Sequence, residues 1–294
     1  MTVYPFAIHL GTWPVIGPFI VTGYGLMLMA AFLCGAWAIH VELQRRGLDE
    51  EFGASIVWWS VLGGIVGAKL WYVGLTGTEA LFRRGGFVWY GGLLGGSAGV
   101  IFAGWLRRVP WRFTADLVAA PLALGYALGR VGCFLVNDDY GIPTSLPWGM
   151  KFPQGLPPTT VGELSQYHIH FPPGTNQLTV VAVHPTEIYE TAAMLFVFWW
   201  LWNRRTHTHG MGWLFGCYLM LAGAERFLIE FIRAKDDRLL GPFTLAQATS
   251  VVLIGVGYYF TRRWQTPDGT GADIDKTLAP RKHEAPKVAP AGAT

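Results

Sequence analysis

Seven stretches of apolar residues, each long enough to cross a lipid bilayer as a helix, constrain the fold of this chain more than any other feature. They lie near residues 17–39, 54–75, 87–106, 114–136, 185–202, 211–232 and 241–261, separated by charged residues, Gly or Pro. Because only 14% of the residues are charged, a soluble fold of this length could not bury so much apolar surface. Lipid offers the backbone no hydrogen-bond partner, which favours helices. The sequence therefore predicts an all-α polytopic membrane protein with about seven transmembrane helices.

Basic residues are divided unequally between alternate loops, and this predicts the orientation. Thirteen Lys and Arg lie on the side that includes the carboxyl-terminal tail, and six lie on the other side. Cytoplasmic loops carry the excess, so we predict a cytoplasmic C-terminus and an N-terminus outside. Arg83 and Arg84 run against this rule. The first 44 residues contain no Lys or Arg, so we expect the first apolar stretch to remain as a span rather than to be a cleaved signal peptide.

The chain divides into a membrane domain and a tail. We predict an integral-membrane domain over residues 1–264, with a long outward loop at about 137–184 that is rich in Pro and Gly. Loops of this length are usually functional, which favours a lid or docking surface; the alternative is a tolerated insertion. Residues 265–294 are polar and rich in Pro, Ala and Lys, which predicts a disordered cytoplasmic tail.

Charge, cysteine and motif patterns argue against several functions. The net charge is +3, and basic residues form short clusters between predicted helices, so we predict no nucleic-acid partner. Cys34, Cys133 and Cys217 lie within apolar stretches and form neither a disulfide framework nor a zinc knuckle. The chain has no Walker loop, dinucleotide fingerprint or metal-ligand spacing. We therefore predict no cofactor and no metal.

Charged side chains inside the predicted spans are the most informative positions. Lys69, Arg130, Arg226 and Glu230 fall there. On insertion scales, a charge at the centre of a helix costs about 2.5 to 3.5 kcal/mol unless it is paired or faces a polar cavity. These four residues are therefore candidates for a functional site.

The arginines can be interpreted in two ways. Small residues flank Arg130, including Gly129 and Gly132, so a lipid phosphate could approach its guanidinium closely. The structural alternative for Arg130 is an interhelical salt bridge. Arg226, Glu230 and Arg233 recur at intervals of four and three and should share one helix face, with a simple ion pair as the alternative for Glu230.

Two further segments could be structural when taken alone. His184 and Tyr189, at the start of the fifth predicted span, suit an interfacial cap and an interfacial aromatic residue. Tyr90 precedes Gly91 and Gly92, and these glycines could belong to a stripe of small residues that packs helices.

Together, several segments resemble the prolipoprotein diacylglyceryl transferase family. The blocks that carry the resemblance follow the family's order over about residues 15 to 262 and comprise Gly129–Phe134, Asn137–Gly141, His184–Glu190 and Glu225–Arg233, with Gly23–Gly25 and Gly67–Val73 as further matches. Each block is weak alone, and the combination is specific.

The resemblance implies a seven-helix enzyme of the bacterial inner membrane, acting on the outer side of that membrane. Its reaction would transfer the diacylglyceryl group of phosphatidylglycerol to the lipobox cysteine thiol of prolipoproteins, forming a thioether and releasing glycerol phosphate. The family's signature arginine matches Arg130, and a second essential arginine matches Arg226. We expect catalytic roles for these two residues and Tyr90. The expected substrate-binding residues are Tyr24, Gly91, Gly92, Asn137, Asp138, Gly141, His184, Tyr189, Glu190, Glu230 and Arg233.

The general base stays open at this stage. Family members carry a candidate histidine where this chain has Tyr90; Cys133 and Lys69 replace a common asparagine and a common arginine. A thiol with a pKa of about 8.5 needs a base or a positive field. The candidates are Tyr90, Glu190, Asp138 and His184, or the leaving phosphate itself. The alternative function is a polytopic lipid or small-solute transporter, because charges within spans also line transport pathways.

Overall fold

The computed structural model describes residues 1–13, 17–82, 86–167, 169–235, 238–240, 243–267, 274 and 277–279. Arg83, Arg84 and most of the predicted tail lie outside these residues. The chain forms two compact units. Unit 1 comprises Met1–Ile39 and Arg112–Asp268, and unit 2 comprises His40–Trp111 and Gly269–Thr294.

Seven long helices lie in the described residues, one in each predicted apolar stretch. Their bounds are α1 (Gly23–Arg45), α2 (Glu51–Thr76), α3 (Trp89–Leu106), α4 (Trp111–Val136), α6 (Thr186–Arg204), α7 (Trp213–Ile229) and α8 (Leu245–Arg263). By length and hydropathy, α1, α2 and α4 qualify as candidate membrane spans in the described part of the chain. The prediction of a mostly helical membrane protein is confirmed, whereas the number of spans and their orientation stay predictions.

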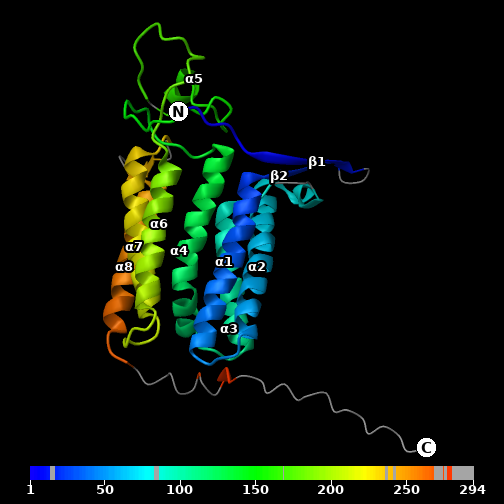
Figure 1. Cartoon of the computed structure of the whole chain (residues 1–294), viewed down its shortest axis with the longest axis vertical. Helices are drawn as coiled ribbons and strands as arrows, with labels where there is room; N and C mark the ends of the chain where they lie inside the picture. The colour runs from blue at the N-terminus through cyan, green and yellow to red at the C-terminus, as the bar shows by residue number, and fades with distance from the viewer. Residues whose placement is uncertain are drawn as a thin grey trace, which may run out of the picture. The chain divides into compact units, whose positions relative to one another are not determined.

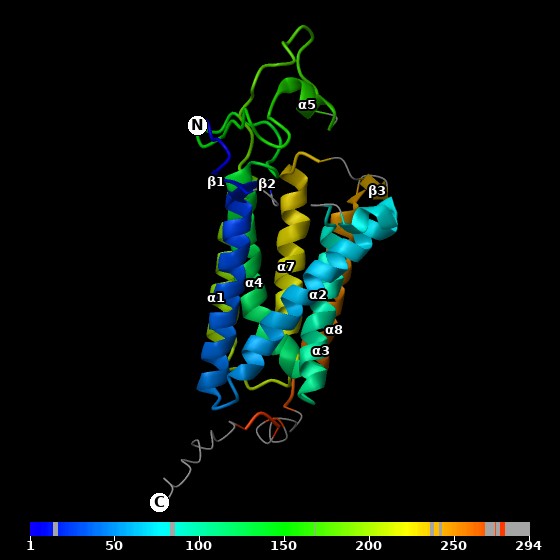
Figure 2. The same ribbon diagram turned by 90° about the vertical axis from the view of Figure 1, so that its right-hand side faces the viewer.

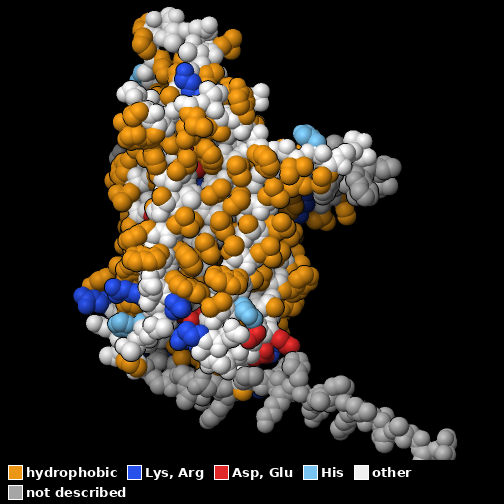
Figure 3. Space-filling view, in the orientation of Figure 1, with side chains coloured by type: hydrophobic (Ala, Val, Ile, Leu, Met, Phe, Trp, Pro, Cys, Tyr) orange, Lys and Arg blue, Asp and Glu red, His pale blue; other side chains and the backbone are white. Residues whose placement is uncertain are grey.

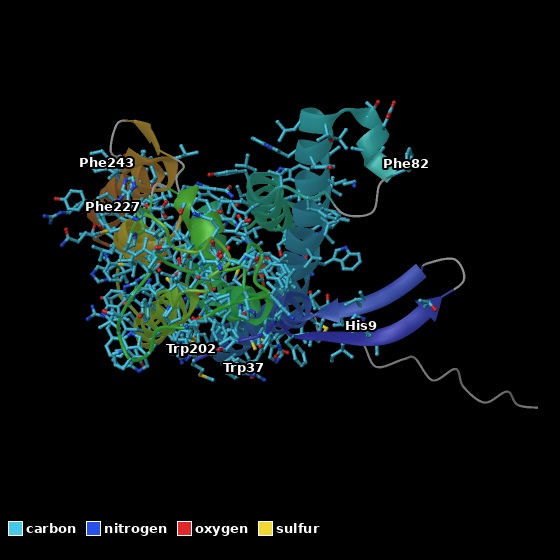
Figure 4. The ribbon with its side chains drawn as sticks, turned by 90° about the horizontal axis from the view of Figure 1, so that it is seen from above. His9, Trp37, Phe82, Trp202, Phe227 and Phe243 are labelled. Carbon is cyan, nitrogen blue, oxygen red and sulfur yellow. The ribbon has the colours of Figure 1, made fainter. Side chains whose placement is uncertain are left out.

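Two short hairpins depart from the all-α prediction. Strand β1 (Ala7–Trp13) pairs antiparallel with β2 (Gly17–Thr22), and β3 (Arg238–Leu240) pairs with β4 (Phe243–Thr244). The start of the first predicted span at residue 17 is therefore wrong, because α1 begins at Gly23. The run Ile20-Val21-Thr22 is rich in β-branched residues, which suit a strand. The first hairpin, with His9 on β1, extends away from the helices of unit 1 (Figure 4).

Small side chains let the unit 1 helices pack closely. Helices α4, α6, α7 and α8 run side by side (Figure 1). The buried cluster between three of these helices consists of Ala119, Ala120, Ala123 and Ala127 of α4, Met194, Val197 and Leu201 of α6, and Leu214 and Cys217 of α7. Lipid is as apolar as these side chains, so close packing rather than burial from water stabilises the contact. Trp37 stacks on Trp202 with ring centroids 6.4 Å apart, and Figure 4 labels both residues.

The predicted loop at 137–184 is an ordered segment of unit 1. It contains the short helix α5 (Val161–Ser165) and lies beyond the ends of α4 and α7, at the end of the unit where the N-terminus lies (Figure 2). Tyr140, Phe152, Leu164 and Val183 form its buried core together with Ala234, which follows α7. Isolated bridges join Pro143 and Met150 to Val183. The segment is thus folded against the end of the helices.

Unit 2 is built on the packing of α2 against α3. A Cβ atom on Gly91 of α3 would lie 2.9 Å from the carbonyl carbon of Gly67 and 2.5 Å from Cβ of Trp71, both on α2. The position of Gly91 therefore agrees with its interpretation as a small residue that lets two helices pack closely. The short 3₁₀ helix η1 (Thr78–Phe82) follows α2.

Part of the predicted tail belongs to unit 2. Of the tail residues that the structure describes, Ile274 and Leu278 are buried, and the N–H of Asp49 donates to the carbonyl of Leu278 at 2.8 Å. The prediction for residues 265–294 stays a prediction, because most of the tail lies outside the described residues.

Hydrophobic side chains cover the flank of the helices. Figure 3 shows apolar side chains over the length of the helices, whereas most charged side chains on this face lie near one end. A surface of this kind suits contact with lipid. Of the charged candidates in the predicted spans, Glu230 is buried, and Lys69, Arg130 and Arg226 are partly buried.

Candidate active site

Three arginines and three carboxylates of unit 1 alternate in a closed set of ion pairs, here called the charge ring. Its members, in order, are Arg130, Glu190, Arg226, Glu230, Arg233 and Asp139. The ring joins the end of α4, the start of α6 and the end of α7. Five of the six residues were predicted site residues, from segments far apart in the sequence.

Glu190 links the two predicted catalytic arginines. Its carboxylate lies 2.5 Å from Nε of Arg130 and 3.7 Å from Nη1 of Arg226. Glu190 is fully buried, whereas the side chains of Arg130 and Arg226 keep 15% and 22% of their area exposed. A buried carboxylate between two guanidinium groups can hold both of them in a fixed relative position. Both arginines still reach space that is not filled by protein.

The second half of the ring lies where α7 ends. Arg226 contacts Glu230 at 2.6 Å, and Glu230 lies 3.4 Å from Arg233. The predicted spacing is correct, but the predicted single helix face is not, because α7 ends at Ile229. Glu230 begins the 3₁₀ helix η2 (Glu230–Ile232), and Arg233 is extended. The tighter last turn keeps the contacts.

Asp139 closes the ring, and it was not predicted as a site residue. It binds Arg233 and Arg130, and Lys235 approaches it at 2.7 Å. Burial alone would raise the pKa of Asp139, but Arg233, Arg130 and Lys235 together hold that pKa well below its usual range. Asp139 is therefore a permanent carboxylate that balances the arginines.

The backbone around Asp139 is fixed by α6 and by the strand-like segment after η2. The hydroxyl of Thr186 donates to the carbonyl of Asp139 at 2.8 Å, and the N–H of Gly141 donates to the carbonyl of His184 at 2.8 Å. A Cβ atom on Gly141 would lie 2.8 Å from Cγ2 of Thr186 and 2.9 Å from Cβ of His184. Only glycine fits at this position.

Asn137 and Asp138 occupy the turn between α4 and Asp139. Asn137 is fully buried and has a left-handed backbone conformation with φ of 58°. Its carbonyl accepts the N–H of Leu156 at 2.9 Å, which ties the turn to the 137–184 segment. Burial and the adjacent Asp139 raise the pKa of Asp138, which also lies within hydrogen-bonding reach of the Cys133 thiol. Asp138 can therefore change its charge more readily than Asp139.

The remaining predicted residues of unit 1 lie around the ring. Nδ1 of His184 is 3.3 Å from the hydroxyl of Tyr189, which accepts the indole N–H of Trp148 at 2.7 Å. Tyr24 opens α1 and lies beside α4, since a Cβ atom on Gly132 would be 3.2 Å from the Cα of Tyr24. Trp148 was not predicted, because nothing in its local sequence indicates a partner on α6.

Tyr90, Gly91 and Gly92 belong to unit 2. Tyr90 is 46% exposed and makes an edge contact with Trp89 at 5.2 Å between ring centroids. A Cβ atom on Gly92 would lie 3.6 Å from Cβ of Ala68 on α2, which is an ordinary contact distance. The predicted roles of these three residues stay predictions.

Open space lies next to Arg130. A Cβ atom on Gly125 or on Gly129 would meet no described atom within 4 Å. On the neighbouring helix, Nη1 of Arg226 is buried and has no hydrogen-bond partner in the described part of the chain. Guanidinium hydrogens that make no hydrogen bond can bind phosphate oxygens. The cluster is therefore suited to binding an anion within the membrane protein.

Two additional carboxyl groups lie beside the ring and were missed by the sequence analysis. Glu187 is on the first turn of α6, and Glu225 precedes Arg226 on α7. All four of their oxygens are buried without a hydrogen-bond partner among the described residues. The described residues contain no group of three or more His, Cys, Asp or Glu that could hold a metal ion.

The fold and the cluster define a helical membrane protein with a largely buried cluster of arginines and carboxylates. Over residues 12–262 the chain matches the family of prolipoprotein diacylglyceryl transferases. Relatives include the phosphatidylglycerol–prolipoprotein diacylglyceryl transferases of Cupriavidus metallidurans, Trichormus variabilis and Nitratidesulfovibrio vulgaris. The first is 31% identical, covering 91% of this chain and 95% of the relative. The second is 29% identical (88% and 93% covered), and the third is 31% identical (84% and 91% covered).

The chain belongs to the prolipoprotein diacylglyceryl transferase family, and it is thus a transferase of lipoprotein biosynthesis. The resemblance predicted from the sequence blocks is confirmed. The roles of individual residues are not tested by this membership.

Proposed function

We propose that this chain transfers the diacylglyceryl group of phosphatidylglycerol to the lipobox cysteine thiol of prolipoproteins. The reaction forms a thioether and releases glycerol phosphate, the first step of bacterial lipoprotein maturation. The observation that carries the proposal is the Arg130–Glu190–Arg226 bridge, in which Nη1 of Arg226 makes no hydrogen bond within the described residues, together with open space beside α4. These are the features that a lipid phosphate requires.

The charge that develops in the reaction explains the two arginines. As the thiol attacks the glyceryl carbon, the bond from that carbon to the phosphate oxygen breaks, and the phosphodiester becomes a monoester with more negative charge. Guanidinium groups already aimed at those oxygens bind the transition state more strongly than the ground state, and this raises turnover. Arg130 and Arg226 are the proposed catalytic pair, with Glu190 and Glu230 as positioning residues.

Among the candidate bases, Asp138 has the best support. Glu190 is engaged by Arg130 and Arg226, and His184 lies against Tyr189. Oδ1 of Asp138 is buried without a hydrogen-bond partner among the described residues. Asp138 therefore has a free oxygen that can take the thiol proton as the new carbon–sulfur bond forms. Tyr90, in unit 2, stays the alternative.

The proposed setting is the bacterial inner membrane, with seven spans, the N-terminus outside and the C-terminus in the cytoplasm. The seven long helices and the unequal division of Lys and Arg support this topology. The charge ring lies next to the 137–184 segment, so the active site would open to the outer side, where that segment can meet the precursor. We propose no cofactor.

The test is a transfer assay with purified protein, phosphatidylglycerol and a lipobox-cysteine peptide. Mass spectrometry would detect the diacylglyceryl peptide and released glycerol phosphate. We expect Arg130→Ala and Arg226→Ala each to lower activity by about 100-fold or more. Arg204→Ala removes an exposed arginine that contacts Trp200 and is the matched control. Folded wild type without product, or active arginine variants, would refute the proposal.

A further inference from the structure

Glu187 and Glu225 lie beside the charge ring, outside its set of ion pairs, and the oxygens of both carboxyl groups are buried. Glu187 is completely buried, and neither oxygen of its carboxyl group has a hydrogen-bond partner among the described residues. The carboxyl oxygens of Glu225 are buried on α7, directly before Arg226. Neither acid forms an ion pair within the described residues, although seven other charged side chains of the site do.

The charge ring is already balanced. Its three arginines face three carboxylates, and the more exposed Lys235 and Asp138 lie at its outer edge. Two more ionised acids would give the buried site a charge of minus two. A site with that charge would repel a lipid phosphate and would oppose the charge that the phosphate gains in the reaction.

The cost of ionisation supports the same conclusion. A buried carboxylate without donors loses its hydration and gains nothing in return, so the neutral acid is the stable form unless a cation is close. The guanidinium groups nearest these acids are already bound by Glu190, Glu230 and Asp139.

We propose that Glu187 and Glu225 are protonated at neutral pH and keep the charge ring neutral, so that it can bind the anionic phosphate of the lipid. This inference rests on the proposed function for its link to the lipid. The titratable and charged groups that face the two acids are Tyr126 and Arg130 of α4, Asp139 and Tyr140 after α4, Glu190 of α6, Tyr218 and Arg226 of α7, and Arg233.

The proposal predicts a particular pH dependence. When pH rises and either acid ionises, one negative charge appears beside the phosphate site. At an effective dielectric of about 20 and a separation of about 8 Å, such a charge weakens binding of a monoanion by at least about tenfold. Glu187→Gln and Glu225→Gln keep the shape and remove this ionisation. We expect each variant to stay within about threefold of wild type at pH 7 and to keep its affinity for phosphatidylglycerol at higher pH than wild type does.

Infrared spectroscopy tests the protonation state of Glu187 and Glu225 independently of enzyme activity. Wild-type protein at about pH 8, where ordinary carboxyl groups are ionised, should show the C=O stretch of protonated carboxylic acids. Part of that band should disappear in each of the two Gln variants. Glu51→Gln, which changes a carboxylate whose side chain is 61% exposed, is the matched control and should leave the band unchanged.

The outcomes separate the two proposals. Absence of the band in wild type, or a band of undiminished intensity in both Gln variants, overturns the protonation of these acids, and so does a Gln variant that folds but loses more than tenfold activity at pH 7. An inactive wild type that shows the band, with part of it lost in each Gln variant, refutes the proposed function instead. It leaves the two neutral acids in place.

Discussion

Replacing Glu190 by glutamine removes the charge that joins the two proposed catalytic arginines while keeping the size of the side chain. The carboxylate is fully buried, with one oxygen 2.5 Å from Nε of Arg130 and the other 3.7 Å from Nη1 of Arg226. In Glu190→Gln, the amide oxygen can still accept a hydrogen bond from one arginine. The amide NH₂ group must then face the other, which also carries only donors.

The expected magnitude follows from the burial of this pair. Two unit charges 4 Å apart interact by about 4 kcal/mol at an effective dielectric of 20. Breaking a buried ion pair by removing one partner costs about 3 to 5 kcal/mol of folding free energy, because the remaining charge stays buried. A displacement of either guanidinium by about 1 Å costs about 100-fold in rate. We therefore expect a loss of both stability and turnover.

Two measurements on the purified variant check this. Unfolding followed by circular dichroism, during titration of denaturing detergent into mixed micelles, gives the change in stability. The transfer assay, run where the variant is still folded, gives the change in kcat/KM. Glu51→Gln is the control, because that carboxylate is largely exposed and pairs with Arg107 only at 3.5 Å. If Glu190→Gln were as stable as wild type and within threefold of its activity, the charge ring would not position the arginines.

Four further outcomes are expected. Asp138→Asn should lower kcat by about 100-fold or more and remove the acid limb of the pH profile, because burial raises the pKa of Asp138 and its ionised form is the proposed base. Tyr90→Phe should keep most of the activity; a loss comparable to that of Asp138→Asn would make Tyr90 the base. Gly141→Ala should cost about 1 to 3 kcal/mol of stability in a thermal melt, since its Cβ would meet two side-chain carbons below 3 Å. Asp139, with a depressed pKa, contributes stability that is complete above about pH 4 and is lost as pH falls below that value, and Asp139→Asn should flatten this part of an unfolding profile.

Hydropathy locates the helices in this chain because lipid-facing surfaces must be apolar throughout. The same property misplaced the start of α1, since the apolar residues of β2 continue directly into the helix. Strand β2 forms because it pairs with β1, which precedes it by a turn. The number of apolar residues in a segment carries no information about such strand pairing.

Local spacing predicts part of the site. Intervals of four and three put Arg226, Glu230 and Arg233 together, and their contacts survive the change from α to 3₁₀ helix. No spacing in the sequence predicts contacts between different helices. Asp139 and Lys235 are predicted by no spacing rule, because their pairing depends on how the segment after α4 meets the segment after α7.

The ring also explains why the 137–184 segment is ordered. Asp139 can close the ring only if its peptide is held in place, and its neighbour Tyr140 does this from inside the segment. The ring of Tyr140 stacks on Phe152 at 5.6 Å, and its hydroxyl donates to the carbonyl of Pro157 at 2.7 Å. A precursor that docks on this segment would therefore act on the same backbone that sets Asp139, and through Asp139 on Arg130. The 137–184 segment therefore helps to position the arginines of the charge ring. Substitutions in its buried core should lower turnover as much as substitutions on its surface do.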